Sequence, residues 1–170
     1  MYREAFYLLN LEGYVQKTPR RGTVVKGFTT EEFRDILEIR NYLELLSIDR
    51  MDTRERGMCL EQMKKLIVEM GNEGLERRAY AKLNYEFHYQ LIKASRSEVI
   101  QNTYSRLASP LISLQSLAFM KEESIRTSLR EHKEIVSLLE KGEMEKAKAL
   151  LNSHNLAVYP RIREMKGLES

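Results

Sequence analysis

The chain has few of the residues that break or cross-link a fold. Its 170 residues include one cysteine, three prolines, eight glycines and no tryptophan. Because Cys59 is alone, an intramolecular disulfide is excluded, and the cysteine content fits a reducing compartment. Proline and glycine are the main helix breakers, so their scarcity leaves long stretches that favour helices.

Long apolar runs are also missing. No run approaches the roughly 18 residues that a membrane-spanning helix needs, and the N-terminus has no signal-peptide pattern. Hydrophobic residues make up 42% of the chain and charged residues 31%, as in a soluble globular protein with one core. We therefore expect a cytoplasmic protein with no membrane partner.

The net positive charge is concentrated at the N-terminus. Residues 1–28 contain five basic and two acidic side chains, which gives +3, and the whole chain is also +3. The remaining residues therefore balance to zero. This asymmetry suggests that the N-terminal piece meets a polyanion, with a small solvated basic patch as the alternative.

The first 27 residues predict a helix followed by a hairpin. Residues 2–11 read as the end of a short amphipathic helix that stops at Gly13. Two β-prone runs, YVQKT and GTVVK, then flank the turn sequence Pro19-Arg20-Arg21-Gly22. The hairpin would have a basic tip.

The rest of the chain predicts a mainly α fold, an antiparallel bundle of about six helices. A capping box at Thr29 and Glu32 opens the first helix. Pro110 should kink or divide the fourth helix, and Pro160 should bend or end the last. The first expected helix opens at the Thr29 capping box and runs at least to Leu46. The others cover about residues 52–71, 75–94 and 97–120, with a fifth that ends at Gly142 and a sixth from about 143.

All three histidines of the chain can reach one level of such a bundle. His88 follows Asn84 by four residues, so the two side chains share one helix face. His132 lies ten residues before Gly142 and His154 twelve after it. Two antiparallel helices joined at Gly142 would therefore hold their imidazoles at nearly the same height.

Together these residues predict a buried metal site. Imidazole and oxygen donors without thiolate suit a divalent ion such as zinc, nickel or manganese. The alternative, for each histidine alone, is a core or interface residue that binds no metal.

Longer segments resemble a known family. YREAFYLLNLEGYVQKTPRRGTVV resembles the second half of a GntR-type winged helix-turn-helix domain, from the recognition helix into the wing. Residues 29–160 resemble the FCD ligand-binding domain of the FadR subfamily. The matching pieces are EIRNYLE, LNYEFHYQLIKAS and EHKEIVSLLEKGEMEKAKALLNSH. The resemblance implies a partial winged helix-turn-helix over residues 1–27 and an FCD-like metal- and effector-binding helical domain over residues 28–170.

Carried over by the resemblance, the family's metal ligands fall on Asn84, His88, His132 and His154. The usual first ligand is an aspartate, so Asn84 departs from the family pattern. A neutral amide would lower metal affinity but leave the ion its full charge for an anionic effector. The alternative for Asn84 is an amide that hydrogen-bonds His88 or a water.

Other residue roles also follow from the resemblance. Arg40 matches an arginine that can face the effector, and its planar guanidinium suits a carboxylate. Its alternative role is an exposed intrahelical pair with Glu44. The expected DNA contacts are Arg3, Lys17, Arg20 and Arg21.

The resemblance begins inside the recognition helix, because nothing before Met1 and Tyr2 matches the two preceding helices of a winged domain. The chain is therefore expected to be a fragment, a shortened reading frame or a sensor remnant with impaired DNA binding.

The leading hypothesis is a homodimeric, ligand-responsive transcription regulator that binds operator DNA and a small anionic metabolite. One rival is a metal-dependent helical enzyme of the ferritin-like class, which carries glutamate three residues before histidine. Those positions hold Tyr85, Leu129 and Leu151, so we expect no enzyme. The other rival is a dimerisation bundle that binds no metal.

Overall fold

The computed structural model describes residues 15–18, 22–25 and 28–165. The chain separates into two compact units, Met1–Phe33 and Arg34–Ser170. The helix expected over residues 2–11 lies outside the described residues.

The described strands of the first unit form an antiparallel pair. Strand β1 (Val15–Thr18) lies beside β2 (Gly22–Val25), with Val15 opposite Val25 and Thr18 opposite Gly22. These strands are the two arms of the predicted hairpin. Its tip, residues 19–21, is outside the described residues.

The second unit is helical, as the sequence predicts. The described part of the chain contains eight helices: α2 (Thr30–Arg50), α3 (Thr53–Met70), α4 (Arg77–Ala94), α5 (Glu98–Arg106), α6 (Ala108–Ala118), α7 (Glu122–Glu140), α8 (Met144–Leu156) and α9 (Val158–Met165). The count exceeds the expected six because two of the predicted helices are each divided in two.

Both divisions have the same cause. Pro110 is the third residue of α6, and Pro160 is the third residue of α9. Each proline therefore lies four residues after the last residue of the preceding helix, Arg106 or Leu156. Proline has no N–H for the carbonyl four residues back and clashes with it, but fits the first turn of a new helix.

Side-chain caps fix the starts of several helices. Thr29 and Glu32 form the predicted capping box, since the Thr29 N–H donates to Glu32 over 2.8 Å and the Glu32 N–H donates to Thr29 over 3.2 Å. Asp52 accepts from the Glu55 N–H at the start of α3. Gly142 has a φ of +73° in the turn between α7 and α8, a conformation that favours glycine.

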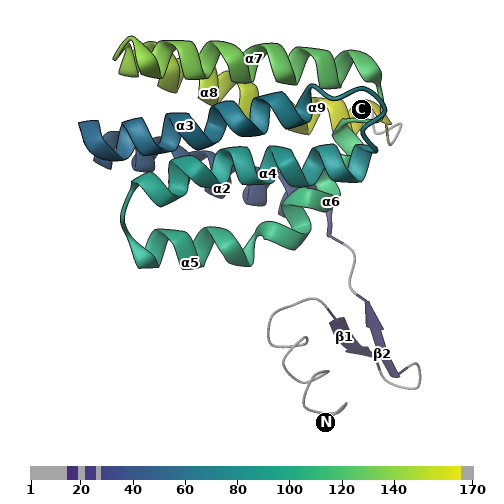
Figure 1. The fold of residues 1–170 in the computed structure, drawn as a ribbon. Helices are drawn as coiled ribbons and strands as arrows, with labels where there is room; N and C mark the ends of the chain where they lie inside the picture. Colours follow the sequence, from purple (N-terminus) through teal and green to yellow (C-terminus); the bar gives the residue numbers. More distant parts are fainter. Residues whose placement is uncertain (1–14, 19–21, 26–27, 166–170) are drawn as a thin grey trace. The chain divides into compact units, whose positions relative to one another are not determined.

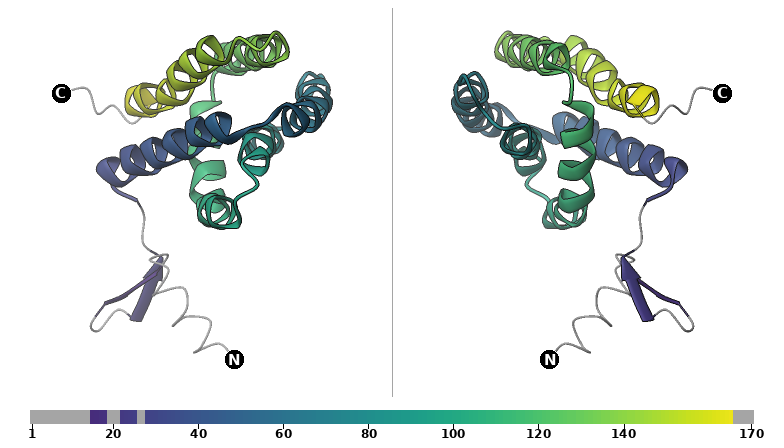
Figure 2. Two further views of the ribbon diagram at one scale, coloured as in Figure 1. Left: turned by 90° about the vertical axis from the view of Figure 1, so that its left-hand side faces the viewer. Right: turned by 90° about the vertical axis from the view of Figure 1, so that its right-hand side faces the viewer.

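Helix α4 lies at the centre of the helical unit, with α3 and α6 packed against it (Figure 1). Helix α7 packs against α3 and pairs with α8, and the side views show α6 crossing the bundle obliquely (Figure 2). The core is formed by residues such as Met63, Phe87, Leu91, Ile135 and Leu151, which are almost fully buried. Among the described residues, no helix is both long enough and apolar enough to cross a bilayer.

Candidate metal centre

Helix α4 carries two of the predicted ligands, and many of its residues are buried. Asn84 and His88 are separated by four residues, so they lie one above the other on the same face. Asn84 is 1% exposed and His88 is fully buried. Both polar side chains therefore lie in the core, where water cannot satisfy them.

The turn at Gly142 brings the other two histidines side by side. His132 lies on α7 and His154 on α8, and both are buried. Their Nε2 atoms are 3.2 Å apart. This separation is close to the roughly 3.3 Å expected between two nitrogens that bind one tetrahedral zinc ion.

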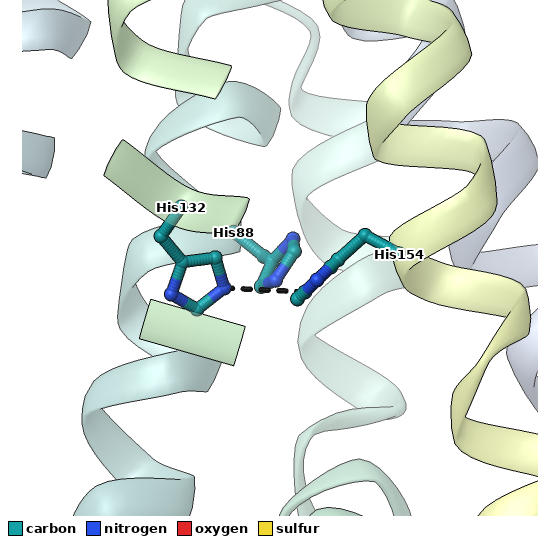
Figure 3. A group of neighbouring side chains, drawn as sticks. All are labelled: His88, His132 and His154. Atoms are coloured by element: carbon teal, nitrogen blue, oxygen red, sulfur yellow. Dashed lines mark hydrogen bonds between the residues drawn. The ribbon is translucent and has the colours of Figure 1, made fainter. Parts of the chain in front are cut away.

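The three imidazoles converge from three helices (Figure 3). One ring nitrogen from each of His88, His132 and His154 lies within 4.8 Å of the others. The His88 ring is 5.2 Å from the His154 ring and 5.3 Å from the His132 ring, measured between centroids. The Phe87 ring stacks on His132 at 4.1 Å and closes one side of the cluster.

Two glutamates orient two of the rings. His88 Nδ1 is 2.8 Å from Glu44 Oε2, and His154 Nδ1 is 2.6 Å from Glu131 Oε2. A carboxylate can only accept from these nitrogens, so each Nδ1 carries the proton. The Nε2 lone pair of both rings is then left for another partner, as in metal-bound histidines that donate to a carboxylate.

Burial keeps the imidazoles neutral. It lowers the pKa of His88 to about 3, assisted by the charge of Arg40. Burial likewise holds the pKa of His132 well below its usual value and lowers that of His154. Neutral imidazole is the form that binds a metal, so these rings need not lose a proton at neutral pH.

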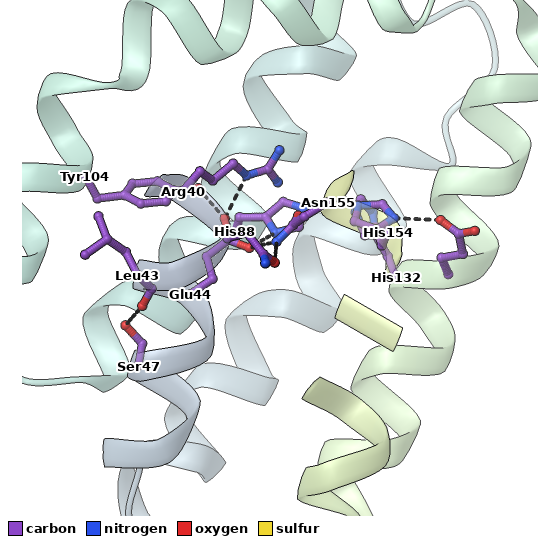
Figure 4. A network of polar contacts seen from close by, with 11 residues as sticks. Arg40, Leu43, Glu44, Ser47, His88, Tyr104, His132, His154 and Asn155 are labelled. Carbon is purple, nitrogen blue, oxygen red and sulfur yellow. Dashed lines mark hydrogen bonds and ion pairs between the residues drawn. The ribbon is translucent and has the colours of Figure 1, made fainter. Parts of the chain in front are cut away.

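Glu44 is the centre of a buried polar network that the sequence did not single out (Figure 4). Besides His88, it accepts hydrogen bonds from Arg40 Nε at 2.8 Å, the Tyr104 hydroxyl at 2.7 Å and Asn155 Nδ2 at 2.8 Å. Burial would raise the pKa of Glu44, but Arg40 and His88 outweigh it and hold that pKa well below its usual range. Glu44 is therefore a carboxylate that links α2, α4, α5 and α8.

Arg40 does pair with Glu44, but the expectation that this pair is exposed is wrong. The two side chains are 1% and 0% exposed. Helical spacing alone cannot reveal this burial, because an arginine and glutamate four residues apart are usually solvated. The Arg40 charge lowers the pKa of all three histidines. Among the described residues, Arg40 Nη2 has no hydrogen-bond partner.

The donor atoms fit a divalent ion. Within the described residues, Asn84 Oδ1 and His88 Nε2 are buried without a hydrogen-bond partner. Buried polar atoms are rarely left unpaired, so these atoms call for a group that accepts electron pairs. Three imidazole nitrogens and an amide oxygen suit zinc, nickel or manganese.

Among the residues expected to contact DNA, the structure describes only the backbone of Lys17. Arg3, Arg20 and Arg21 lie outside the described residues. Lys17 lies in β1, where its backbone is opposite Thr23. Their proposed role therefore rests on the sequence.

Comparison with known proteins agrees with this architecture. The profile of the FCD domain matches residues 35–157. Over 156 residues the chain is 27% identical to the "Uncharacterized HTH-type transcriptional regulator YdhC" of Bacillus subtilis, covering 89% of this chain and 69% of that protein. It is 23% identical over 172 residues to the "HTH-type transcriptional regulator LutR" of the same species, covering 89% and 78% of the two chains.

Solved structures show the same fold. A putative GntR transcriptional regulator from Rhodococcus sp. RHA1 superposes with a TM-score of 0.74 at 18% identity, covering 96% of this chain and 79% of that one. McbR/YncC from E. coli superposes with a TM-score of 0.69 at 16% identity, with the same coverage.

Proposed function

This chain belongs to the FCD-domain family of GntR-type transcriptional regulators, and we propose that its helical unit binds one divalent metal ion and a small carboxylate effector. Its relatives are regulators and not enzymes. The observation that supports the proposal most directly is the convergence of three buried, neutral histidines from α4, α7 and α8.

The ligand set we propose is Asn84, His88, His132 and His154. Asn84 contributes its unpartnered Oδ1 from the position one turn before His88. All four ligands are neutral, so a bound ion keeps its charge and supplies a binding position for an anion. Glu44 and Glu131 hold two of the rings in the orientation that leaves Nε2 available.

Arg40 supports an anionic effector. Its Nε donates to Glu44, while Nη2 is buried and has no partner in the part of the chain that the structure describes. A carboxylate would satisfy this nitrogen with a charge-assisted hydrogen bond. Because Glu44 already neutralises Arg40, an incoming carboxylate would owe its affinity mainly to the bound ion and to this hydrogen bond.

We also propose how the effector reaches the DNA-binding region. Arg40 and Glu44 lie on α2, which directly follows the hairpin in the chain. An effector that binds one position of α2 better than another would bias the spacing of two winged domains in a homodimer. Such coupling requires a difference in affinity between two arrangements, which a binding measurement can detect.

The test combines metal analysis with calorimetry. Purified protein is analysed for metal, loaded with zinc, and titrated with acetate and butyrate. We expect about one ion per chain, and carboxylate binding that disappears when the ion is removed by chelation. If the purified protein contains no metal and takes up none of zinc, nickel and manganese, the result would instead support the dimerisation bundle that binds no metal.

The DNA contacts are tested separately. We propose that Arg3, Lys17, Arg20 and Arg21 face DNA phosphates or a groove. Replacing Arg20 and Arg21 together by glutamate should weaken DNA binding and flatten its salt dependence in a mobility-shift series, because fewer counterions are released. Exchange of the exposed Lys133 and Lys141 for glutamate is the matched control.

A further inference from the structure

Helix α2 is apolar on two opposite faces. Its inner face carries Ile36, Leu37 and Ile48, each no more than 9% exposed. Its outer face carries Ile39 and Tyr42, which are 47% and 67% exposed. A helix with apolar residues all round is normally covered on every side. The outer face of α2 is therefore a candidate interaction surface.

The apolar residues of the outer face form one continuous stripe. Ile39, Tyr42 and Leu46 follow one another at intervals of three and four residues, so their side chains lie in line along the helix. Leu43 flanks this line, four residues after Ile39. Leu43 and Leu46 are half-buried, so the stripe presents its apolar surface to solvent at its centre.

A residue of opposite charge closes each end of the stripe. Asp35 precedes Ile39 by four residues and Arg50 follows Leu46 by four. Both are exposed, and Asp35 lies 4.0 Å from Arg34 Nε, at the outer limit of an ion pair. The ends of the stripe thus carry one negative and one positive group that a partner can pair.

The neighbouring acidic side chains on the flank of the stripe have cations in their own chain. Glu38 lies 3.8 Å from Arg34 Nε, and Asp49 accepts from Lys148 Nζ at 2.7 Å. These intrachain pairs reduce the negative charge that a partner of α2 would meet. The charge pattern at the two ends of the stripe therefore decides which partner fits.

This pattern is complementary to an antiparallel copy of itself. With a twofold axis between Tyr42 and Leu43, Ile39 lies opposite Leu46 of the second copy, and Asp35 lies opposite Arg50 of the second copy. The same register pairs apolar with apolar and acid with base, twice in each interface. A twofold interface requires this match, because each subunit contributes the same patch.

We propose that two copies of the chain pair through the α2 stripe, in antiparallel orientation and in this register. The stripe consists of Asp35, Ile39, Tyr42, Leu43, Leu46 and Arg50. The inference rests on the proposed function, because it identifies the surface that forms the homodimer. Arg40 and Glu44 lie on the other side of the same helix, so the helix that joins the two copies also carries the residue proposed to meet the effector.

Exchange of the end charges tests the register. Asp35→Arg and Arg50→Asp each place like charges opposite one another at both ends of the interface, so each should weaken dimerisation at least about tenfold. The double variant restores opposite charges and should return the dissociation constant to within about threefold of the wild type. Sedimentation velocity over a concentration series measures the constant.

Glu61→Arg is the matched control for charge, since Glu61 is an exposed residue of α3 that pairs with Lys65. It should leave the dissociation constant unchanged. Restored dimerisation in the double variant depends on the pairing of Asp35 with Arg50, which a general loss of stability could not reproduce. Failure of the double variant to recover would overturn the proposed register.

A charge at the centre of the stripe tests the surface itself. Tyr42→Glu should make the protein monomeric, because two carboxylates would meet beside the twofold axis. Val68→Glu on α3, where the side chain is 71% exposed, is the matched control and should remain dimeric. Circular dichroism and zinc content should match the wild type in both variants, which separates this test from that of the metal site.

Three results would overturn the inference. These are a monomeric wild-type protein at micromolar concentration, a dimer that persists in Tyr42→Glu, and a dimer that is insensitive to both single charge exchanges. A dimer that persists in Tyr42→Glu would leave the homodimer of the proposed function intact and assign it to another surface. Loss of zinc binding in the wild type would count against the proposed metal site alone.

Discussion

His88 donates a hydrogen bond from Nδ1 to Glu44 Oε2 over 2.8 Å, and neither side chain is exposed. The same carboxylate accepts from Arg40 and Tyr104, so the His88 ring of the proposed metal site is joined to Arg40, the residue proposed to meet the effector. A substitution at Arg40 should therefore alter metal affinity, and a substitution at His88 should alter effector affinity.

The first prediction concerns the metal. His132→Ala should lose most of the bound zinc, because it removes one of three converging nitrogens. Plasma mass spectrometry of protein loaded with zinc and freed of excess ion measures the content. Lys133→Ala, which changes the exposed neighbour, should retain about one ion per chain. Equal zinc content in the two variants would contradict the proposed site.

Asn84→Asp should have opposite effects on the two ligands. An anionic oxygen should tighten zinc by on the order of tenfold and weaken butyrate binding, because it lowers the net charge of the site. Competition with a fluorescent chelator gives the zinc affinity, and calorimetry gives the butyrate affinity. Unchanged zinc affinity would place Asn84 outside the coordination sphere.

Removal of the buried negative charge of Glu44 should destabilise the folded protein. Glu44→Gln leaves Arg40 in the core without its counterion, so the free energy of unfolding should fall by about 3–5 kcal/mol. Glu140→Gln is the matched control, because Glu140 pairs with Lys64 at the surface, where the expected loss is below about 1 kcal/mol.

Urea titrations of the metal-free proteins measure both losses. The Glu44 variant should also bind zinc about 10–100-fold more weakly, because His88 loses the charged acceptor that orients it. Similar stability losses at Glu44 and Glu140 would contradict the buried network.

Cys59 should be unreactive in the folded protein. Burial raises the pKa of its thiol to about 12, and its Sγ lies 3.4 Å from Met63 Sδ. Since the thiolate is the reactive form, Ellman's reagent at about pH 8 should label Cys59 slowly until the protein unfolds. Rapid labelling of the native protein would show that Cys59 is exposed.

The same pKa shift predicts a pH dependence of stability. In the unfolded chain the thiol ionises near pH 9, whereas in the folded protein it remains protonated to about pH 12. Its contribution to stability is therefore full below pH 9 and is lost as the pH rises from there towards 12. The stability difference between the wild type and Cys59→Ala should shrink by up to about 1.4 kcal/mol per pH unit above pH 9.

Local features of the fold could be predicted from the sequence because they depend on neighbouring residues. The Thr29–Glu32 capping box and the turn at Gly142 are set by hydrogen bonds and dihedral angles within a few positions. The breaks at Pro110 and Pro160 follow from a missing N–H four residues after a carbonyl. Their exact positions, three residues before each proline, were not predicted.

The convergence of the three histidines could be predicted from the sequence only in part. The distances of His132 and His154 from Gly142 determine their relative height in an antiparallel pair. Whether both side chains turn inwards, and whether His88 on a helix distant in sequence meets them, depends on how α4 packs against its neighbours.

By itself, the sequence determined the helical class, the hairpin strands, the main turns and the residue types at the candidate metal site, since periodicity and capping act locally. Only the tertiary structure decided that Arg40 and Glu44 are buried, because their spacing is equally suited to a solvated surface pair. Burial depends on Tyr104 and Asn155, which lie 60 and 111 residues after Glu44 in the sequence. Packing against those side chains excludes water, and it is this exclusion that turns an ordinary ion pair into the centre of a buried network.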